Sequence, residues 1–229
     1  MLILIVCTEG ESSEPAFIRQ YGRCALGQIH PDIEIVEIPL GGNHGHKKIF
    51  EIANKKIEEL KQSDDSILSL IDPESDIALQ KIIICDYDKM EKHGITEDDF
   101  RNAAAENEFQ LIINKPNFEF FILAYLTNFE YASKIKPSNY LAEINTAIDV
   151  LNKENHSVKG LPEALDIPHY DKNRYTSEKF FSNLLEYNRS ELDQKFCAHE
   201  PCIQEKQYTQ MKNLITLIQE HSKEKQYNE

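Results

Sequence analysis

The sequence predicts an α/β fold in which a four-stranded parallel sheet is flanked by helices and followed by an α-helical C-terminal part. Short apolar runs alternate with amphipathic helical patterns through the first half of the 229 residues. This alternation implies parallel strands joined by right-handed crossovers. From Ser138 onward only helical patterns follow. We therefore expect one domain over residues 1–130 and a helical extension over residues 131–229 that packs on it.

Four segments have the pattern of strands. Residues 2–7 (LILIVC) and 81–85 (KIIIC) are largely continuous apolar runs, as expected for strands that are buried on both faces. Residues 33–38 (IEIVEI) alternate apolar and acidic side chains, and residues 110–113 (QLII) form a fourth, shorter run. The region 63–76 is predicted to be a loop or a short irregular insertion.

The segments between and after these strands have helical spacing. Pro15 stands near the start of the first helix, where proline is well tolerated. Thr96 and the acids after it are a typical helix start. The polar residues 222–229 are expected to fray. The expected helices cover residues 14–27, 46–62, 96–108, 117–128, 138–153, 160–166, 176–187 and 207–222.

Composition and charge narrow the function classes. The chain has 25 Lys and Arg against 39 Asp and Glu, for a net charge of −14. This acidic balance argues against a protein that binds nucleic acid through its overall electrostatic field. It allows a local basic groove or a basic partner. No apolar run is long enough for a membrane span, and the N-terminus lacks the basic flank of a secretory signal. The five scattered cysteines are typical of reduced thiols, so we expect a cytoplasmic protein.

Acidic residues come directly after three of the predicted strands. The carboxyl ends of parallel strands form the ligand-binding edge of an open sheet, so these side chains are expected to meet there. Crowded carboxylates repel one another unless a cation neutralises them, and Mg²⁺ (or Mn²⁺) prefers carboxylate ligands. Any single acid could instead cap a helix. The candidate metal ligands are Glu9, Asp86, Asp88, Glu14 and Glu119, with Glu11 as a further candidate.

The same segments resemble known motifs. A Glu-Gly after the first strand and a DxD after the third are similar to the Toprim domain of topoisomerases, primases and OLD-type nucleases. More narrowly, the chain resembles the RloB family, which includes the AbiL abortive-infection component, over about residues 1–190. Lys115 stands where that family usually has Asn, and Phe121 where it has Trp. The matching segments are Glu9-Gly10-Glu11…Glu14-Pro15 ("EGExTE"), Asp86-Tyr87-Asp88 ("DxD"), Lys115 to Phe121 ("NPxFExW") and Tyr170-Asp171-Lys172 ("YxK").

This resemblance implies a Toprim-like (Rossmann-like) catalytic domain and a metal-dependent nuclease of a phage-defence system, often encoded beside an ATPase partner. Asp86 and Asp88 would hold Mg²⁺, Glu9 would serve as general acid/base or as a further ligand, and Lys172 would stabilise charge on a phosphate. DNA, RNA and transfer RNA stay open as nucleic-acid substrates. The alternative is a non-catalytic interaction subunit that keeps the Toprim fold and regulates a partner ATPase.

Three other features have competing interpretations. The glycine-rich stretch Gly41–Lys48, with His44 and His46, opens a helix and could contact phosphate, but it lacks the Walker spacing and a flexible loop is favoured. Zinc binding by Cys197 and Cys202 is disfavoured because no second ligand pair is present. Lys172 and Arg174 belong either to a solvated loop or to a segment folded over the acidic edge. Four aromatic residues are expected to be core contacts rather than base-stacking residues: Phe118, Phe120, Phe121 and Tyr125.

Overall fold

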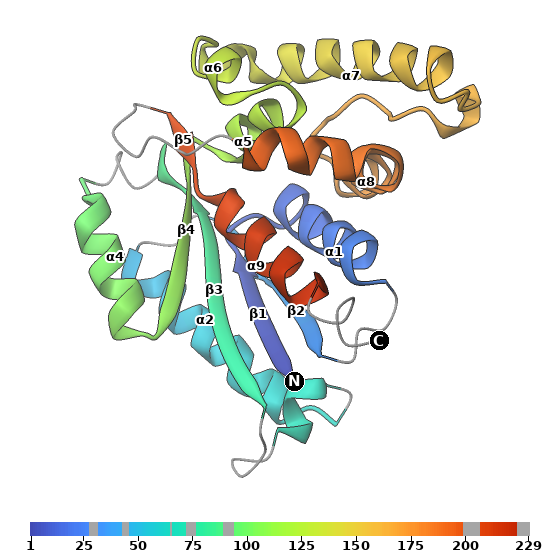
Figure 1. Ribbon diagram of the computed structural model, residues 1–229. Helices are drawn as coiled ribbons and strands as arrows, with labels where there is room; N and C mark the ends of the chain where they lie inside the picture. The colour runs from blue at the N-terminus through green and yellow to red at the C-terminus, as the bar shows by residue number, and fades with distance from the viewer. Residues whose placement is uncertain are drawn as a thin grey trace.

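The computed structural model contains one five-stranded sheet with the strand order β2-β1-β3-β4-β5 (Figure 1). The first four strands are parallel, and β5 pairs antiparallel with β4. The strands are β1 (Leu2–Thr8), β2 (Ile33–Pro39), β3 (Ala78–Asp86), β4 (Phe109–Lys115) and β5 (Tyr208–Thr209). The structure describes residues 1–27, 32–42, 46–64, 66–71, 77–88, 94–198 and 207–223.

The four predicted parallel strands are confirmed, but the prediction of a four-stranded sheet was wrong by one strand. β5 lies at the start of the segment 207–222, which was expected to be entirely helical. It has only two residues, so it cannot show the alternation of buried and exposed side chains by which a strand is recognised. Its position at the edge of the sheet depends on contacts with β4, nearly a hundred residues earlier in the chain.

Helices occupy most of the predicted positions, with one clear correction. The segment 160–166 is not an α-helix: it contains only a 3₁₀ turn at Glu163–Leu165, between Gly160, whose φ is 66°, and an extended stretch. The expected helix 117–128 is divided in two, and 176–187 is part of a longer helix. The helices are α1 (Ser13–Leu26), α2 (His46–Lys61), α4 (Glu97–Glu106), α5 (Phe118–Leu126), α6 (Phe129–Ala132), α7 (Tyr140–Ser157), α8 (Arg174–Cys197) and α9 (Met211–Lys223), with further 3₁₀ turns η1 (Ile67–Leu70) and η2 (Pro137–Asn139).

Two expectations fall partly outside the described residues. Of the predicted loop 63–76, residues 66–71 contain the short turn η1, while residues 72–76 lie outside the described ranges. Of the expected frayed segment 222–229, residues 222–223 complete α9 and the rest also lies outside those ranges. Within the described parts of the chain, no helix is both long and apolar enough to cross a membrane.

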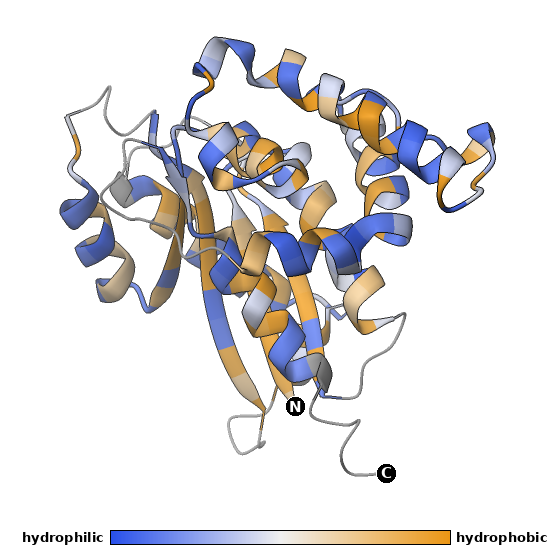
Figure 2. Ribbon diagram, turned by 45° about the horizontal axis from the view of Figure 1, so that its top comes forward, coloured by the Kyte–Doolittle hydropathy of each residue, from blue (hydrophilic) through white to orange (hydrophobic). Residues whose placement is uncertain are grey.

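Each face of the sheet is covered by helices, so the strands are apolar on both sides (Figures 1 and 2). Successive strand residues point to opposite faces. Leu4, Val6, Ile82 and Ile84 belong to a core cluster shared with α1, α5, α7, α8 and α9. Their neighbours in sequence belong to a second cluster shared with α2 and α4. The first cluster draws on both predicted domains, and it contains the aromatic residues of α5, as expected for core contacts.

The buried carboxylate of Asp193 connects four helices through hydrogen bonds. Asp193 of α8 is 4% exposed and accepts hydrogen bonds from the hydroxyls of Tyr21 in α1 (2.9 Å) and Tyr125 in α5 (2.7 Å). Gln219 of α9 donates to the same carboxylate at 2.9 Å, and Arg189 lies 3.4 Å away. Burial raises the pKa of Asp193, and the tyrosine hydrogen bonds oppose that shift. The helices are therefore fixed to one another by polar contacts as well as by apolar packing.

Replacing Asp193 by alanine is expected to destabilise the protein strongly, because Tyr21 and Tyr125 would lose the acceptor of their buried hydroxyls. We expect a loss of about 3 kcal/mol in the free energy of unfolding, measured by urea denaturation. Tyr21→Phe is the control, because it leaves the Asp193 carboxylate and its hydrogen bond from Tyr125 in place and should cost about 1 kcal/mol. A loss for Asp193→Ala no larger than that for Tyr21→Phe would contradict the role of Asp193 as a shared acceptor.

Candidate functional site

The turns that follow the four parallel strands meet at one edge of the sheet. Backbone hydrogen bonds join each turn to a neighbouring strand or turn, so their positions relative to one another are fixed. The turn after β1 therefore lies beside the turns after β2 and β3, and the turn after β3 lies beside the turn after β4. The bonds run from Leu40 N–H to the Thr8 carbonyl (2.9 Å), from Glu9 N–H to the Ile84 carbonyl (3.0 Å) and from Asp88 N–H to the Pro116 carbonyl (3.0 Å).

Glu9 and Asp86 are brought together at this edge. Asp86 is the last residue of β3, and it lies on the same face as Ile82 and Ile84, toward α1 and α5. Its backbone N–H donates to the Glu9 carboxylate at 3.3 Å. Glu9 is only 5% exposed, although it lies in a turn. Asp88, two residues beyond Asp86, is half-buried beside the turn that follows β4.

Two helices direct further carboxylates to the same place. Glu14 lies in the first turn of α1 and Glu119 in the first turn of α5, where the positive end of the helix dipole favours negative charge. Asn117 caps α5 by accepting a hydrogen bond from the Phe120 N–H. Both glutamates are buried, at 8% and 7% exposed. The Glu14 carboxylate lies so close to Gly10 that a β-carbon there would overlap it unless Glu14 moved.

This crowding of carboxylates changes the pKa of Asp86. Burial raises the pKa of Asp86 well above its usual value, and the negative charges of Glu14, Glu119, Glu9 and Asp88 raise it further. Its Oδ1 atom is buried and accepts no hydrogen bond from any described residue. Within the described ranges, no three Asp, Glu, His or Cys side chains are arranged closely enough to hold a metal ion as they stand. The acids therefore surround Asp86 without forming a closed ligand set.

Lys172 reaches the acidic edge from the C-terminal half. Its ammonium group lies 2.7 Å from the Glu119 carboxylate, yet the lysine side chain is 66% exposed. Beside it, the buried Tyr170 hydroxyl donates to Ser13 at 2.7 Å and lies 3.4 Å from Glu119. Burial, and then the charge of Glu119, raise the pKa of Tyr170, so its hydroxyl stays protonated. Of the two interpretations of Lys172, the structure has the segment folded over the acidic edge.

Residues 166–172, here called the docked segment, are fastened to one side of α7. The four α7 residues involved are spaced so that they share a helix face. The two asparagines each bond both the N–H and the carbonyl of a docked residue, and the other two contacts are His–Asp pairs. The contacts are Asn145 with Tyr170 (2.7 and 3.3 Å), Asp149 with His169 (2.9 Å), Asn152 with Ile167 (3.0 and 3.0 Å) and His156 with Asp166 (2.5 Å).

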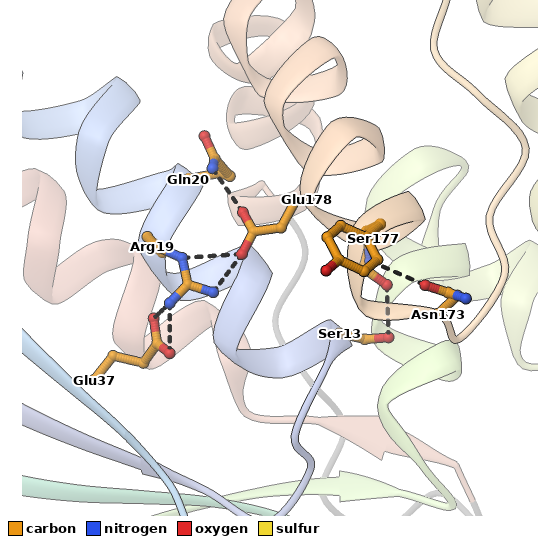
Figure 3. A network of polar contacts seen from close by, with 8 residues as sticks. Ser13, Arg19, Gln20, Glu37, Asn173, Ser177 and Glu178 are labelled. Carbon is orange, nitrogen blue, oxygen red and sulfur yellow. Dashed lines mark hydrogen bonds and ion pairs between the residues drawn. The ribbon is translucent and has the colours of Figure 1, made fainter.

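Polar contacts also hold the start of α8 against α1, as Figure 3 shows. Arg19 of α1 makes two hydrogen bonds to Glu37 of β2 (2.8 and 2.6 Å) and also binds Glu178 of α8 (3.0 Å from Nε). Nearer the site, the hydroxyls of Ser13 and Ser177 lie 3.3 Å apart. These contacts fix the position of α8, which follows the docked segment. They therefore also fix the backbone position of Lys172 at the end of that segment.

The structure says less about the other residues that the sequence suggested as candidates. Glu11 is exposed, and its carboxylate lies where a β-carbon at Gly41 would be, in the turn after β2, where φ is 75°. His44 lies outside the described residues, and the side chains of His46 and Arg174 are not described although they begin α2 and α8. Cys197 is the last residue of α8, while Cys202 lies outside the described ranges. Zinc binding there stays untested.

Sequence reasoning missed several residues that shape the site. Ser13, Asn145 and Asn114 were not selected as candidates, and Tyr170 was noted only as part of a motif. Asn114 did carry a signal, because it is a polar residue at the end of an apolar strand, like Asp86. Asn145 carried none, because its partner is a backbone segment that has no pattern of its own.

The docked segment provides a direct test of this geometry. Asn145→Ala removes both side-chain bonds to Tyr170, so amide hydrogen exchange at Tyr170 should accelerate by about 2–10-fold, the equivalent of one lost hydrogen bond. Thr146→Ala is the matched control, because the Thr146 hydroxyl bonds only to its own helix, at the Ala142 carbonyl. Equal exchange at Tyr170 in both variants would show that Asn145 does not fasten the segment.

Comparison with known proteins agrees with the motifs in this site. The chain matches the family model described as "RloB-like protein" over residues 3–218, a span that includes every candidate residue from Glu9 to Lys172. Searches of curated proteins and of solved structures found no match. Because the family model covers nearly the whole chain, this protein belongs to the RloB-like family.

Proposed function

We propose that this protein is a Mg²⁺-dependent nuclease that hydrolyses phosphodiester bonds in DNA or RNA. One observation carries the proposal: Asp86 keeps a buried carboxylate oxygen that accepts no hydrogen bond from the described residues, while four other carboxylates surround it. Such an arrangement is costly for an unliganded protein, since like charges repel and a buried acceptor loses its hydration. A cation at this edge would relieve both costs.

The residues present fit a hard divalent cation. The available donors are carboxylate oxygens, and Mg²⁺ is usually bound by one or two carboxylates together with water and substrate phosphate. Asp86 and Asp88 would hold the ion, with Glu9, Glu14 and Glu119 as further ligands. In the absence of a cation, mutual repulsion favours side-chain rotamers that keep these groups apart, so an open ligand set is expected. Bound Mg²⁺ would supply positive charge against the phosphate and favour ionisation of water.

The remaining steps belong to the chain's own side chains. Glu9 would accept or return a proton, and its contact with the Asp86 backbone N–H supports this role because it keeps the Glu9 carboxylate beside the proposed ion. Lys172 would turn from Glu119 to a phosphate oxygen of the substrate, because its own side chain is 66% exposed although its partner Glu119 is buried. Its ammonium group would then stabilise negative charge that develops on the phosphate.

The family resemblance extends the proposal to a role in phage defence with a partner ATPase. The net charge of −14 supports a need for a partner, because neutralising phosphates with Lys and Arg dominates nucleic-acid affinity. A basic partner would supply that affinity and keep the nuclease under control. We propose the same arrangement whether the substrate is DNA, RNA or transfer RNA.

A non-catalytic interaction subunit is the second candidate. It is favoured by the open ligand set among the described residues and by the ion pair that neutralises Glu119. The two candidates differ in one property: the catalytic one requires a divalent ion at Asp86, whereas the interaction subunit does not. Binding of Mn²⁺ by the purified chain, followed by electron paramagnetic resonance, separates them.

Asp86→Asn should abolish Mn²⁺ binding while raising stability in EDTA, because it removes one of the crowded charges. Relief of about 1 kcal/mol would raise the melting temperature by about 2–4 °C. The pKa of Asp86 is raised on folding, so the wild-type protein loses stability as the pH climbs from about 4 through the folded pKa. The advantage of Asp86→Asn should therefore grow from acidic to neutral pH.

The matched control for this variant is Glu51→Gln. Glu51→Gln removes one negative charge, as Asp86→Asn does. Glu51 is an exposed acid of α2, which covers the opposite face of the sheet, so its removal leaves the acidic site unchanged. It should leave Mn²⁺ binding intact and show no such growth of stability with pH. If Asp86→Asn binds Mn²⁺ as well as the wild-type protein does, the metal assignment is wrong.

Cleavage of nucleic acid should require the metal and should be inefficient for the isolated chain. Mixed DNA, RNA and transfer RNA incubated with Mg²⁺ or Mn²⁺ should be cut slowly, and EDTA or Asp86→Asn should stop the reaction. Affinity, already weak, should fall further as salt is raised, since it rests on contacts of Lys and Arg with phosphates. Tight binding by the purified chain at physiological salt would contradict the proposed dependence on a partner.

A further inference from the structure

Asn114 is a fully buried polar residue beside the acidic site that the proposed mechanism does not use. It lies near the end of β4 with no exposed surface, and the strand register pairs it directly with Asp86 of β3. Ile112 and Ile84 place both residues on the same face of the sheet. A carboxylate and an amide therefore stand next to each other at the same edge.

The contacts of Asn114 define which way its amide points. The Thr209 hydroxyl of β5 accepts a hydrogen bond from the Met211 N–H at 3.1 Å and donates its own proton to Asn114 Oδ1 at 2.6 Å. The amide oxygen thus faces β5, which leaves the NH₂ group on the side away from β5. The reverse orientation would turn a second acceptor oxygen toward the carboxylates around Asp86, which electrostatic repulsion disfavours.

The strand that supplies Thr209 is itself fixed to β4. The backbone N–H of Gln210 donates to the Ile113 carbonyl at 3.0 Å, and the Gln210 side chain accepts from the Ile113 N–H at 3.0 Å. These two bonds sit directly beside Asn114. The position of the Thr209 hydroxyl is therefore set by the sheet itself.

One donor and one acceptor are left unsatisfied at this register position. Asn114 Nδ2 and Asp86 Oδ1 are both buried, and neither has a hydrogen-bond partner among the described residues. Buried polar groups in folded proteins are nearly always paired, and a buried water joins such groups where they do not touch. We propose that Asn114 is a positioning residue that donates to Asp86 Oδ1, directly or through one buried water, and that Thr209 orients it.

This link would hold one oxygen of Asp86 in the interior and leave the other for the edge of the sheet. Groups that hydrogen-bond a metal ligand fix its orientation, and their loss typically lowers metal affinity by about 10–100-fold. This consequence for metal binding rests on the proposed function, whereas the hydrogen-bonded link does not. The C-terminal strand β5 would thereby adjust the acidic site without contributing a carboxylate.

The link can be tested in EDTA, without any metal, by nuclear magnetic resonance. The side-chain amide signals of Asn114 are identified by their loss in Asn114→Leu. They should shift in Asp86→Ala and in Thr209→Val, while Thr209→Ser should restore the wild-type position. Glu51→Ala is the control for loss of an acid and should leave them unchanged. Asn114 signals that do not respond to Asp86→Ala would overturn the inference.

Mn²⁺ affinity then tests the consequence. Asn114→Leu should weaken binding by about 10–100-fold, and Thr209→Val should weaken it less, because the amide remains but is no longer oriented. Asn188→Leu is the matched control: Asn188 is also a buried asparagine with an unpartnered Nδ2 among the described residues, and it lies on α8 beside Lys159.

The outcomes of the two experiments are distinguishable. If the wild-type protein binds no Mn²⁺, the proposed function fails, and the resonance experiment alone decides the role of Asn114. If the wild-type protein and Asn114→Leu bind Mn²⁺ equally, the positioning role is wrong while the proposed function stands. Loss of affinity in Asn188→Leu equal to that in Asn114→Leu would also overturn it, because the effect would then be one of general stability.

Discussion

The crowding of negative charge around Asp86 is the constraint on which the rest of the site depends. Two helices direct their N-termini toward it, so that Glu14 and Glu119 are stabilised by the helix dipoles. Gly10 leaves room for the Glu14 carboxylate, which fills the space that a β-carbon would occupy. Lys172 contributes the positive charge that reaches Glu119. Each of these features limits the cost of placing acids at one sheet edge.

The C-terminal half supplies what the sheet alone lacks. Its helices are fixed by a large apolar core and by the shared acceptor Asp193, so they form a rigid support. The docked segment is held by side-chain bonds from α7 and also by the core, because Ile167 and Tyr170 are buried in the same apolar cluster. Tyr170 further donates a hydrogen bond to Ser13 of α1. Lys172 is thus presented by a segment that both polar contacts and apolar packing fix in place.

The sequence predicted those parts of the fold in which pattern and burial agree. β1 and β3 were recognised because strands covered on both faces are almost entirely apolar, and α1 and α7 because their buried residues recur with helical spacing. β5 could not be predicted, because two residues carry no pattern and its pairing depends on distant β4. The segment 160–166 misled because a few apolar residues near Pro162 have helical spacing by chance.

The residues of the candidate site also divide into those that the sequence could predict and those that it could not. Acids that directly follow strands were predictable, since the parallel topology alone brings strand ends together. The contact of Lys172 with Glu119 was only one of two interpretations, because it depends on how α7 holds residues 166–172. Asn145 and Asn152 act on the backbone of that segment, and no pairing between side chain and backbone can be read from residue types. Glu97 and Tyr208, whose side chains meet at the far side of β4, were missed because residue types do not reveal a pairing between side chains 111 positions apart.

The late position of β5 in the chain has a consequence for synthesis. Thr209, which pairs with Asn114, lies 95 residues after it, so at ordinary translation rates of about 5–20 residues per second β4 waits about 5–20 s for its neighbour. Until then the end of β4 that pairs with residues 208–210 is an open sheet edge, of the kind that invites pairing with other chains. We therefore expect the nascent chain to be exposed to such pairing after the parallel strands have formed and before residues 208–210 arrive. Thr209 would orient the Asn114 side chain at the acidic edge only after this interval.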